Sequence, residues 1–195
     1  MIAIVDLEIG NFANVEKAIS GRVTKDKKLI EKADKLVLPG VGNFGEAARS
    51  LDKLKGVILE QIETGVPFLG ICLGMQLLFP SSSEASGKGL GVIQGEVKRL
   101  PENASPHIGW NQVFSNGEVA LLEGVSAGSY FYFVHSFYVQ PDNSDLVTGT
   151  TEYRDSDEVK EFASAVKRNN VYGVQFHPEK SSRKGLEVLQ NFKEL

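Results

Sequence analysis

The sequence predicts an α/β fold with a mostly parallel central sheet that is flanked by helices. Short apolar runs, which suit strands buried on both faces, alternate with segments of helical spacing. Glycines mark tight turns between these segments, and a β-rich stretch follows in the second half of the chain. The 195 residues contain no internal repeat and no low-complexity linker, so we expect one domain over residues 1–195.

The strand–helix alternation occupies the first half of the chain. Spacing predicts strands at residues 2–5, 35–40 and 66–71. It predicts helices at residues 12–20, 43–54 and 55–64, and a further helix that begins with "LGMQLLF".

The second half of the chain lacks this strand–helix alternation and is rich in β-type segments. Residues 87–137 are β-rich pieces joined by glycine, asparagine and proline turns. Residues 161–177 are typical of a hairpin, with Asn169 and Asn170 at its turn. A final helix is expected over residues 184–195. The predicted sheet therefore carries a β-rich insertion.

Composition excludes several classes of protein. The net charge of -4 and the pI of about 5.5 argue against a nucleic-acid-binding surface. A single cysteine cannot form an internal disulfide. The longest apolar run, residues 66–80, is too short and too broken to span a bilayer, and the N-terminus lacks the basic region of a signal peptide. We therefore expect a cytoplasmic enzyme or binding protein with no membrane association.

Cys72 lies between Gly70 and Gly74, after a strand-like run and before a helix-like one. This is the cysteine form of the G-x-S-x-G nucleophile elbow, in which glycines permit a sharp strand-to-helix turn. The turn would place the thiol at the carboxyl edge of the sheet, and the helix N-terminus would favour the thiolate. The alternative is a small buried side chain, which is the commoner role of a lone cysteine.

A nucleophile needs a base, and "VQFHPE" offers one. His177 ends a strand-like run, and Pro178 keeps its neighbours extended. Residues i and i+2 of an extended segment project to the same side, so His177 and Glu179 can face one pocket. The carboxylate would then fix the tautomer of the imidazole. The alternative is an ordinary surface turn, but together with the elbow the pattern favours a Cys-His-Glu triad.

These motifs occur together in one family. The chain resembles the class I (triad) glutamine amidotransferases through "GICLGMQ", "PGVGNF" and "VQFHPE". More narrowly, it is similar to the glutaminase subunits of imidazole glycerol phosphate synthase through "GKGLGVIQGEVKRLP", "PHIGWNQV" and "YFVHSFYV". The resemblance implies a single flavodoxin-like class I glutamine amidotransferase domain that hydrolyses glutamine to glutamate and ammonia.

The resemblance also assigns roles to residues. Cys72 would attack the carboxamide of glutamine, His177 would transfer protons, and Glu179 would orient His177. The oxyanion would be met by the amide of Leu73 and by that of either Val41 or Gly42. Substrate contacts would come from Gly40, Gln76, His135, Ser136 and Phe137. Without the resemblance, Gln76 would be interpreted as a solvated helix position and His135 as a core histidine.

The resemblance implies a partner as well as a substrate. The ammonia would pass to a (β/α)8-barrel cyclase subunit in a heterodimer that makes imidazole glycerol phosphate and aminoimidazole carboxamide ribotide, in histidine biosynthesis. We expect the docking face around the mouth of the site to include Asn11, Asn14, Trp110 and Lys180; simple core packing is the alternative for Trp110. We expect no cofactor and no metal site, because the three histidines lack ligand-like spacing.

Some residues depart from the family pattern. The first loop reads "DLEIGN", where a tyrosine and a glycine usually follow the aspartate, and Phe137 stands where tyrosine is common. The segment between Asn11 and Pro39 is also several residues shorter than the family pattern, which indicates a trimmed first helix or a minimal second strand. None of these departures affects the three residues of the predicted triad. Two other functions stay open at this point: a glutaminase that serves a different synthase, and a non-catalytic flavodoxin-like protein with a buried or redox-sensing cysteine.

Overall fold

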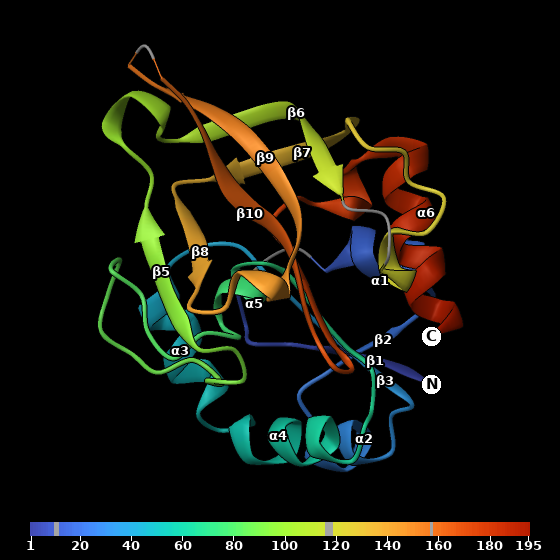
Figure 1. Cartoon of the computed structure of the whole chain (residues 1–195). Coiled ribbons are helices and arrows are strands. Elements are labelled where there is room, and N and C mark those ends of the chain that lie inside the picture. The colour runs from blue at the N-terminus through green and yellow to red at the C-terminus, as the bar shows by residue number, and fades with distance from the viewer. Residues whose placement is uncertain (10–11, 116–118, 157) are drawn as a thin grey trace.

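A single mixed sheet with helices on both faces forms the centre of the molecule (Figure 1). The computed structural model describes residues 1–9, 12–115, 119–156 and 158–195. One half of the sheet is parallel, with strands in the order β2 (Arg22–Thr24), β1 (Ile2–Val5), β3 (Lys35–Gly40), β4 (Phe68–Cys72) and β11 (Val171–Val174). The carboxyl ends of these strands lie at one edge, where Gly40 pairs with Cys72.

The other half of the sheet is antiparallel. It continues from β11 through β10 (Glu158–Arg168), β9 (Val147–Asp155), β6 (His107–Ser115) and β7 (Ser129–His135). A side branch consists of β8 (Phe137–Pro141), which pairs with β10, and β5 (Gly95–Arg99), which pairs with β8. In Figure 1 the long β9–β10 pair reaches beyond the rest of the sheet. The expected α/β fold with a β-rich insertion is confirmed.

Helices bury both faces of the parallel half. One face packs against α2 (Lys27–Glu31), α3 (Phe44–Leu51) and α4 (Lys55–Glu63). The other face packs against α1 (Ala13–Ile19) and α6 (Ser182–Glu194), with η2 (Ala120–Leu122) beside α6. Ala3 and Val5 of β1 point into the first cluster and Ile4 into the second. This two-sided burial explains why the strands have continuous apolar sequences.

Several elements differ from the expectation in detail. Residues 27–31 form α2, for which no helix was predicted. Residues 147–155 form β9, for which no strand was predicted. The expected hairpin is confirmed as β10–β11, and Asn169 in its turn has a φ of 53°. The second strand has only three residues, as the short segment before Pro39 indicated.

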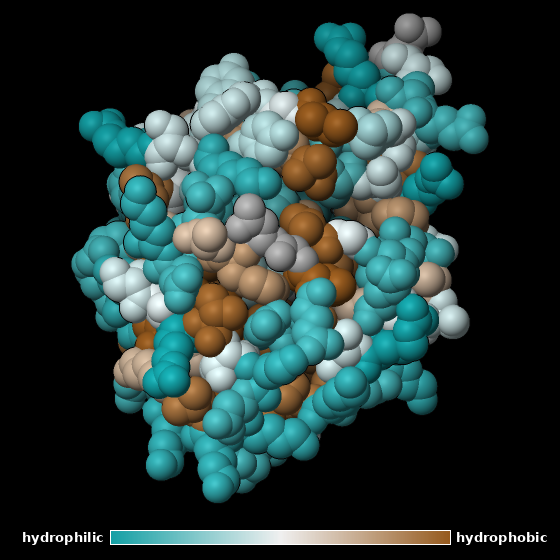
Figure 2. Space-filling model, turned by 180° about the vertical axis from the view of Figure 1, so that it is seen from behind, coloured by the Kyte–Doolittle hydropathy of each residue, from teal (hydrophilic) through white to brown (hydrophobic). Residues whose placement is uncertain are grey.

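Short 3-10 turns complete the chain at η1 (Glu102–Ala104), η3 (Ser144–Leu146) and η4 (Pro178–Lys180). On the face shown in Figure 2, hydrophilic side chains cover most of the surface and hydrophobic ones lie in small groups. Among the described residues, no helix is both long enough and apolar enough to cross a membrane.

Candidate active site

Cys72 occupies a strained turn at the carboxyl end of β4. Its φ of 54° and ψ of -108° lie where side chains other than glycine are rare. A Cβ on Gly70 would come within 2.6 Å of the carbonyl oxygen of Gly74, and a Cβ on Gly74 within 1.7 Å of that of Leu38. Both glycines are therefore required by close backbone contacts, as the elbow motif predicted.

The helix behind Cys72 is much shorter than predicted. The helix α5 (Leu73–Gln76) has four residues, and the following residues turn away. The carbonyls of Leu77 and Leu78 accept hydrogen bonds from the amides of Leu90 and Ile93, and Pro80 disfavours a helical residue before it. The expected helix over "LGMQLLF" is therefore wrong in its length, and the prediction that a helix N-terminus favours the thiolate now depends on a single turn.

His177 and Glu179 face each other beyond the end of β11. The Nδ1 atom of His177 lies 2.8 Å from Oε1 of Glu179, and both side chains are at least 95% buried, with exposures of 3% and 5%. The backbone N–H of His177 donates to the carbonyl of Tyr132 at 2.9 Å. The structure thus brings the predicted base and its predicted orienting carboxylate into direct contact.

Ser181 braces this turn, although sequence reasoning did not single it out. Its hydroxyl donates to the carbonyl of His177 at 2.6 Å and accepts from the N–H of Tyr132 at 2.9 Å. These two bonds attach the segment after β11 to β7. The serine stands four residues after the histidine in "HPEKS", and only the fold shows that it joins two halves of the sheet.

The electrostatic surroundings of His177 favour its charged form. Burial lowers the pKa of His177, but Cys72 and Glu179 act as acceptors and as negative neighbours that outweigh burial, and the pKa rises to about 9. The Nε2 atom is buried and makes no well-aligned hydrogen bond to any described residue. This nitrogen is therefore available for proton transfer.

A cavity of about 250 Å3 opens beside Cys72. Its lining comprises Val41, Gly42, Cys72, Leu73, Gln76, Glu84, Val134, His135, Ser136 and Phe137. All three residues predicted for the oxyanion hole are among them. Gly40 instead lines a second, much narrower space together with His177 and Glu179. The volume suits a small polar molecule.

The wall from His135 to Phe137 is already hydrogen-bonded within the protein. The carbonyl of Phe137 accepts from Nδ1 of His135 at 2.8 Å and from Nε2 of Gln76 at 3.0 Å, so both of its lone pairs are used. The carbonyl of Ser136 accepts from the amide of Leu100. Any substrate contact from this wall must therefore use other groups. The backbone leaves the strand geometry at Ser136, between β7 and β8.

His135 is a neutral histidine. Burial lowers its pKa to about 3, against a smaller opposing effect of the hydrogen bond to Phe137. With Nδ1 protonated toward Phe137, its Nε2 atom is an acceptor, and this atom has no partner among the described residues. His107 stacks on it with ring centroids 5.2 Å apart.

Two further residues of the site were missed by sequence reasoning. Gln175 is completely buried, and its Nε2 atom lies 3.5 Å from Sγ of Cys72. It stands two residues before His177, so strand alternation could have placed it on the same side. Glu84 lines the cavity, and its Oε2 atom accepts from the N–H of Phe44 at 2.7 Å. The loop that carries Glu84 offers no motif that would have revealed it.

The predicted interface residues have different settings. The side chain of Trp110 is 49% exposed, which rules out simple core packing, and its ring lies edge-on to Tyr132 at 6.2 Å. Lys180 is exposed, with Nζ 5.9 Å from the centroid of Tyr132. Asn14 is exposed on α1. Asn11 lies outside the described residues.

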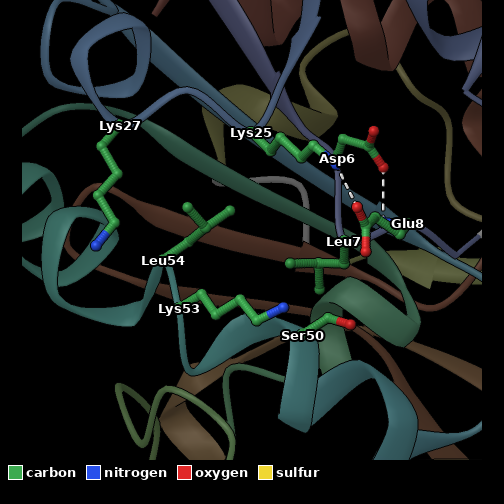
Figure 3. A pocket seen from close by; sticks show the side chains of 8 residues that line it. All are labelled: Asp6, Leu7, Glu8, Lys25, Lys27, Ser50, Lys53 and Leu54. Carbon is green, nitrogen blue, oxygen red and sulfur yellow. Dashed lines mark hydrogen bonds and ion pairs between the residues drawn. The ribbon is translucent and has the colours of Figure 1, made fainter.

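A second cavity, of about 300 Å3, lies at the carboxyl ends of β1 and β2 (Figure 3). Two of its charged side chains, Lys25 and Glu8, form an ion pair, and the carboxylate of Asp6 accepts from the backbone N–H of Glu8 at 2.7 Å. Its lining consists of Asp6, Leu7, Glu8, Lys25, Lys27, Ser50, Lys53 and Leu54, and it holds neither a cysteine nor a histidine. The cavity at Cys72 is therefore the better candidate for chemistry.

The comparisons with known proteins agree with this geometry. The family model of "Glutamine amidotransferase class-I" matches residues 12–195. This chain is a class I glutamine amidotransferase. Solved structures of similar fold include "Structure of PurLQS from Thermotoga maritima", with a TM-score of 0.76 at 19% identity over 98% of this chain and 96% of that one. The "glutaminase domain with bound acivicin" of Trypanosoma brucei CTPS gives 0.68 at 14% identity over 99% and 93%.

Closer relatives of this amidotransferase carry one name. "Imidazole glycerol phosphate synthase subunit HisH" from Pyrococcus furiosus is 55% identical over 195 residues, which are 100% of this chain and 98% of the relative. The protein of the same name from Thermococcus kodakarensis is 55% identical over 100% of both chains. The sequence similarity extends over the elbow at Cys72, the wall of the cavity and the turn that carries His177 and Glu179.

Proposed function

We propose that this amidotransferase hydrolyses glutamine and supplies the ammonia to the cyclase subunit of an imidazole glycerol phosphate synthase, in histidine biosynthesis. The observation that carries the proposal is the arrangement at the sheet edge. Cys72 occupies a strained elbow that opens on a cavity, and the buried pair of His177 and Glu179 lies beside it. Relatives that match the full chain at 55% identity carry the synthase subunit name. The cytoplasm is the compartment we propose.

The chemistry follows from the properties of the three residues. The sulfur of Cys72 attacks the carboxamide carbon of glutamine, and His177 takes the thiol proton. The tetrahedral oxyanion would accept from the backbone amides of Leu73 and of Val41 or Gly42. His177 then protonates the departing nitrogen, which leaves as ammonia, and a glutamyl thioester remains. Water activated by His177 hydrolyses the thioester, so that glutamine and water give glutamate and ammonia.

Glu179 keeps the proton on Nδ1 of His177 and stabilises the imidazolium that forms at each step. The 2.8 Å contact and the low exposure of both side chains support this role. The raised pKa of His177, about 9, favours the imidazolium form of this residue.

The cavity offers complementary groups for the amino-acid end of glutamine. Glu84 is a carboxylate on its wall and suits the α-ammonium group. Both protons of the Gln76 amide are engaged by protein acceptors, so Gln76 can contact substrate only through Oε1. We propose that His135, Ser136 and Phe137 form the opposite wall and shape the cavity around the substrate.

The partner would dock beside the mouth of this cavity. The outer face of the β6–β7 hairpin, which we define by Ile108, Trp110, Tyr130 and Tyr132, presents large side chains with exposures of 59% for Ile108 and 56% for Tyr130. Val134 lies on the same side of β7 and lines the cavity. An aromatic surface continuous with the site suits a subunit that receives ammonia directly, because ammonia released into water is largely protonated.

We propose that this partner is a (β/α)8 barrel and that the two chains form a heterodimer. Two exposed residues, Asn14 on α1 and Lys180 on η4, would also belong to the interface. The pairing of subunits would explain how two reactions are coupled, since this chain would produce the ammonia and the barrel would incorporate it.

The test is glutamate release from glutamine. The purified chain would be assayed alone, with the barrel cyclase, and with the cyclase and its nucleotide ligand; Cys72→Ala serves as the control. We expect weak hydrolysis that rises with the partner and is absent from the variant. Hydrolysis that ignores the cyclase would keep the glutaminase and contradict the role in histidine biosynthesis. A folded protein without hydrolysis under any condition would contradict the whole proposal.

A further inference from the structure

A chain of hydrogen bonds leads from the wall of the cavity to the sulfur of Cys72. The carbonyl of Phe137 accepts from Nε2 of Gln76 at 3.0 Å. The same nitrogen donates to Oε1 of Gln175 at 3.2 Å, and Nε2 of Gln175 lies 3.5 Å from Sγ of Cys72. The two glutamine side chains therefore form a relay between β8 and the nucleophile.

The relay has a fixed direction. The backbone carbonyl of Phe137 can only accept, so the amide of Gln76 must present its NH2 group there. The second proton of that NH2 group meets Gln175, which must present its oxygen. The NH2 group of Gln175 is then left facing the sulfur. An acceptor at one end of the relay thus dictates a donor at the other.

Burial holds the relay in place. Gln175 is 0% exposed and Gln76 is 5% exposed, so water does not compete for their amides. The backbone N–H of Gln175 donates to the carbonyl of Ser164 at 2.9 Å, which anchors the residue to β10. A buried side-chain amide of this kind is costly unless its groups are paired, and here the sulfur is one of its partners.

The contacts of the sulfur distinguish its two protonation states. The carbonyl of Val134, 3.9 Å away, can accept only from the thiol. The amide of Gln175 donates most strongly to the thiolate, because hydrogen bonds to a charged acceptor are the stronger ones. With α5 reduced to a single turn, this donor replaces much of what a longer helix would supply.

We propose that Gln175 is a further catalytic residue, which donates a hydrogen bond to Sγ of Cys72, holds it toward the cavity and stabilises its thiolate through the relay from Phe137. The proposal rests on the proposed function of Cys72 as the nucleophile. No covalent step is added: the same thiolate attacks glutamine and later leaves from the thioester, and Gln175 keeps its own protons throughout.

The pH profile of alkylation of Cys72 by iodoacetamide tests this role without requiring glutamine hydrolysis. The variant Gln175→Met keeps the size of the side chain and removes both hydrogen bonds. We expect alkylation at neutral pH to slow about tenfold and the midpoint of its pH profile to rise by about one unit. The titratable groups around the sulfur are unchanged in this variant; they are His177, Glu179, His135 and Glu84.

Two further variants separate the relay from general disturbance of the interior. Gln76→Met cuts the first link but leaves the amide of Gln175 beside the sulfur, so the midpoint should rise less than in Gln175→Met. Ser164→Ala removes a fully buried hydroxyl that has no partner among the described residues, and the midpoint should stay at the wild-type value. A midpoint that Gln175→Met leaves unchanged would overturn the proposal.

A measurement on the unmodified sequence covers the case in which Gln175→Met does not fold. In 15N-labelled protein, the side-chain amide protons of Gln175 should shift with pH at the midpoint found by alkylation, and this titration should be lost in Cys72→Ala. An amide that does not titrate would contradict the proposal. If the amide titrates but glutamine is not hydrolysed, the proposed function fails while the contact of Gln175 with the sulfur stands.

Discussion

The parallel and antiparallel halves of the sheet expose their side chains in opposite ways. In the parallel half, β1, β3 and β4 send alternate residues into two hydrophobic clusters, and both faces are covered by helices. In the antiparallel half, β6 alternates between partly buried residues and exposed ones, and Ile108 and Trp110 reach the surface. One half is therefore constrained from both sides, whereas the other has a free face.

The proposed chemistry uses this difference. Cys72 and His177 follow strands of the constrained half, where neighbouring carboxyl ends hold them close. The opposite wall of the cavity, from Val134 to Phe137, belongs to the other half. A nucleophile and its base need fixed geometry, and a docking surface needs exposed area. The boundary between the two halves of the sheet provides both the fixed geometry and the exposed area.

The largest effect is expected on stability, from a substitution at the elbow in the parallel half of the sheet. Gly74→Ala would place a Cβ 1.7 Å from the carbonyl oxygen of Leu38, so the elbow must move and stability should fall by roughly 4 kcal/mol or more. Gly56→Ala is the matched control, because a Cβ on this helical residue meets nothing within 4 Å and should stabilise by about 0.5–1 kcal/mol. Urea unfolding measures both. A tolerated Gly74→Ala would show that the elbow is not tightly held.

The second prediction concerns the negative charge of Glu179, which lies at the carboxyl edge of the parallel half. Glu179→Gln keeps an acceptor near His177 but removes the carboxylate, so kcat should fall by roughly 10²–10⁴ with a smaller change in KM. Glu187→Gln makes the same change in an ion pair with Lys184 on α6 and should leave kcat unchanged. Steady-state glutamate release measures both. Equal values of kcat would remove Glu179 from the mechanism.

The two halves also differ in how far the sequence predicts them. Strands buried on both faces have continuous apolar runs, so β1, β3 and β4 were predictable from residue type alone. The strand β9 was not, because "VTGTTEYRD" is polar and its pairing with β10 depends on contacts distant in sequence. The helix α2 was missed for a related reason: its charges face solvent, and only Ile30 is buried.

The candidate site was predictable where local geometry determines it. Gly70, Cys72 and Gly74 define an elbow by spacing alone, and His177 and Glu179 meet because they are two residues apart in an extended segment. The length of α5 was not predictable, because hydrogen bonds from Leu90 and Ile93 end it.

Gln175 and Glu84 show the same limit. Each reaches the site through partners that lie more than thirty positions away, since Gln175 contacts Cys72 and Glu84 contacts Phe44. Such partners become neighbours only when segments distant in sequence pack together, so neither contact follows from a local pattern, although strand alternation indicates that Gln175 lies on the side of His177.

The third prediction concerns how the contribution of His177, at the end of the parallel half, to stability depends on pH. His177 has a pKa of about 9 in the folded protein, against 6.5 for an unperturbed histidine. Its contribution to stability is therefore complete below about pH 6.5 and is lost as the pH rises through 9, at a cost of roughly 3 kcal/mol. Cys72→Ala removes one of the groups that raise this pKa, so the free energy of unfolding of this variant should fall less between pH 6.5 and 9. Urea unfolding at a series of pH values measures this. The prediction is contradicted if the free energies of unfolding of the wild type and of Cys72→Ala change with pH by equal amounts.

The smallest effect is expected at the free face of the other half. Trp110→Ala removes the largest side chain from the outer face of the β6–β7 hairpin and should weaken the affinity for the cyclase by about 2 kcal/mol, roughly thirtyfold. Val159→Ala is the control, since Val159 on β10 is 56% exposed and lies outside this face. Titration calorimetry with the cyclase measures both. Equal affinities would move the docking surface away from the hairpin, and the parallel half would then carry the interface as well as the chemistry.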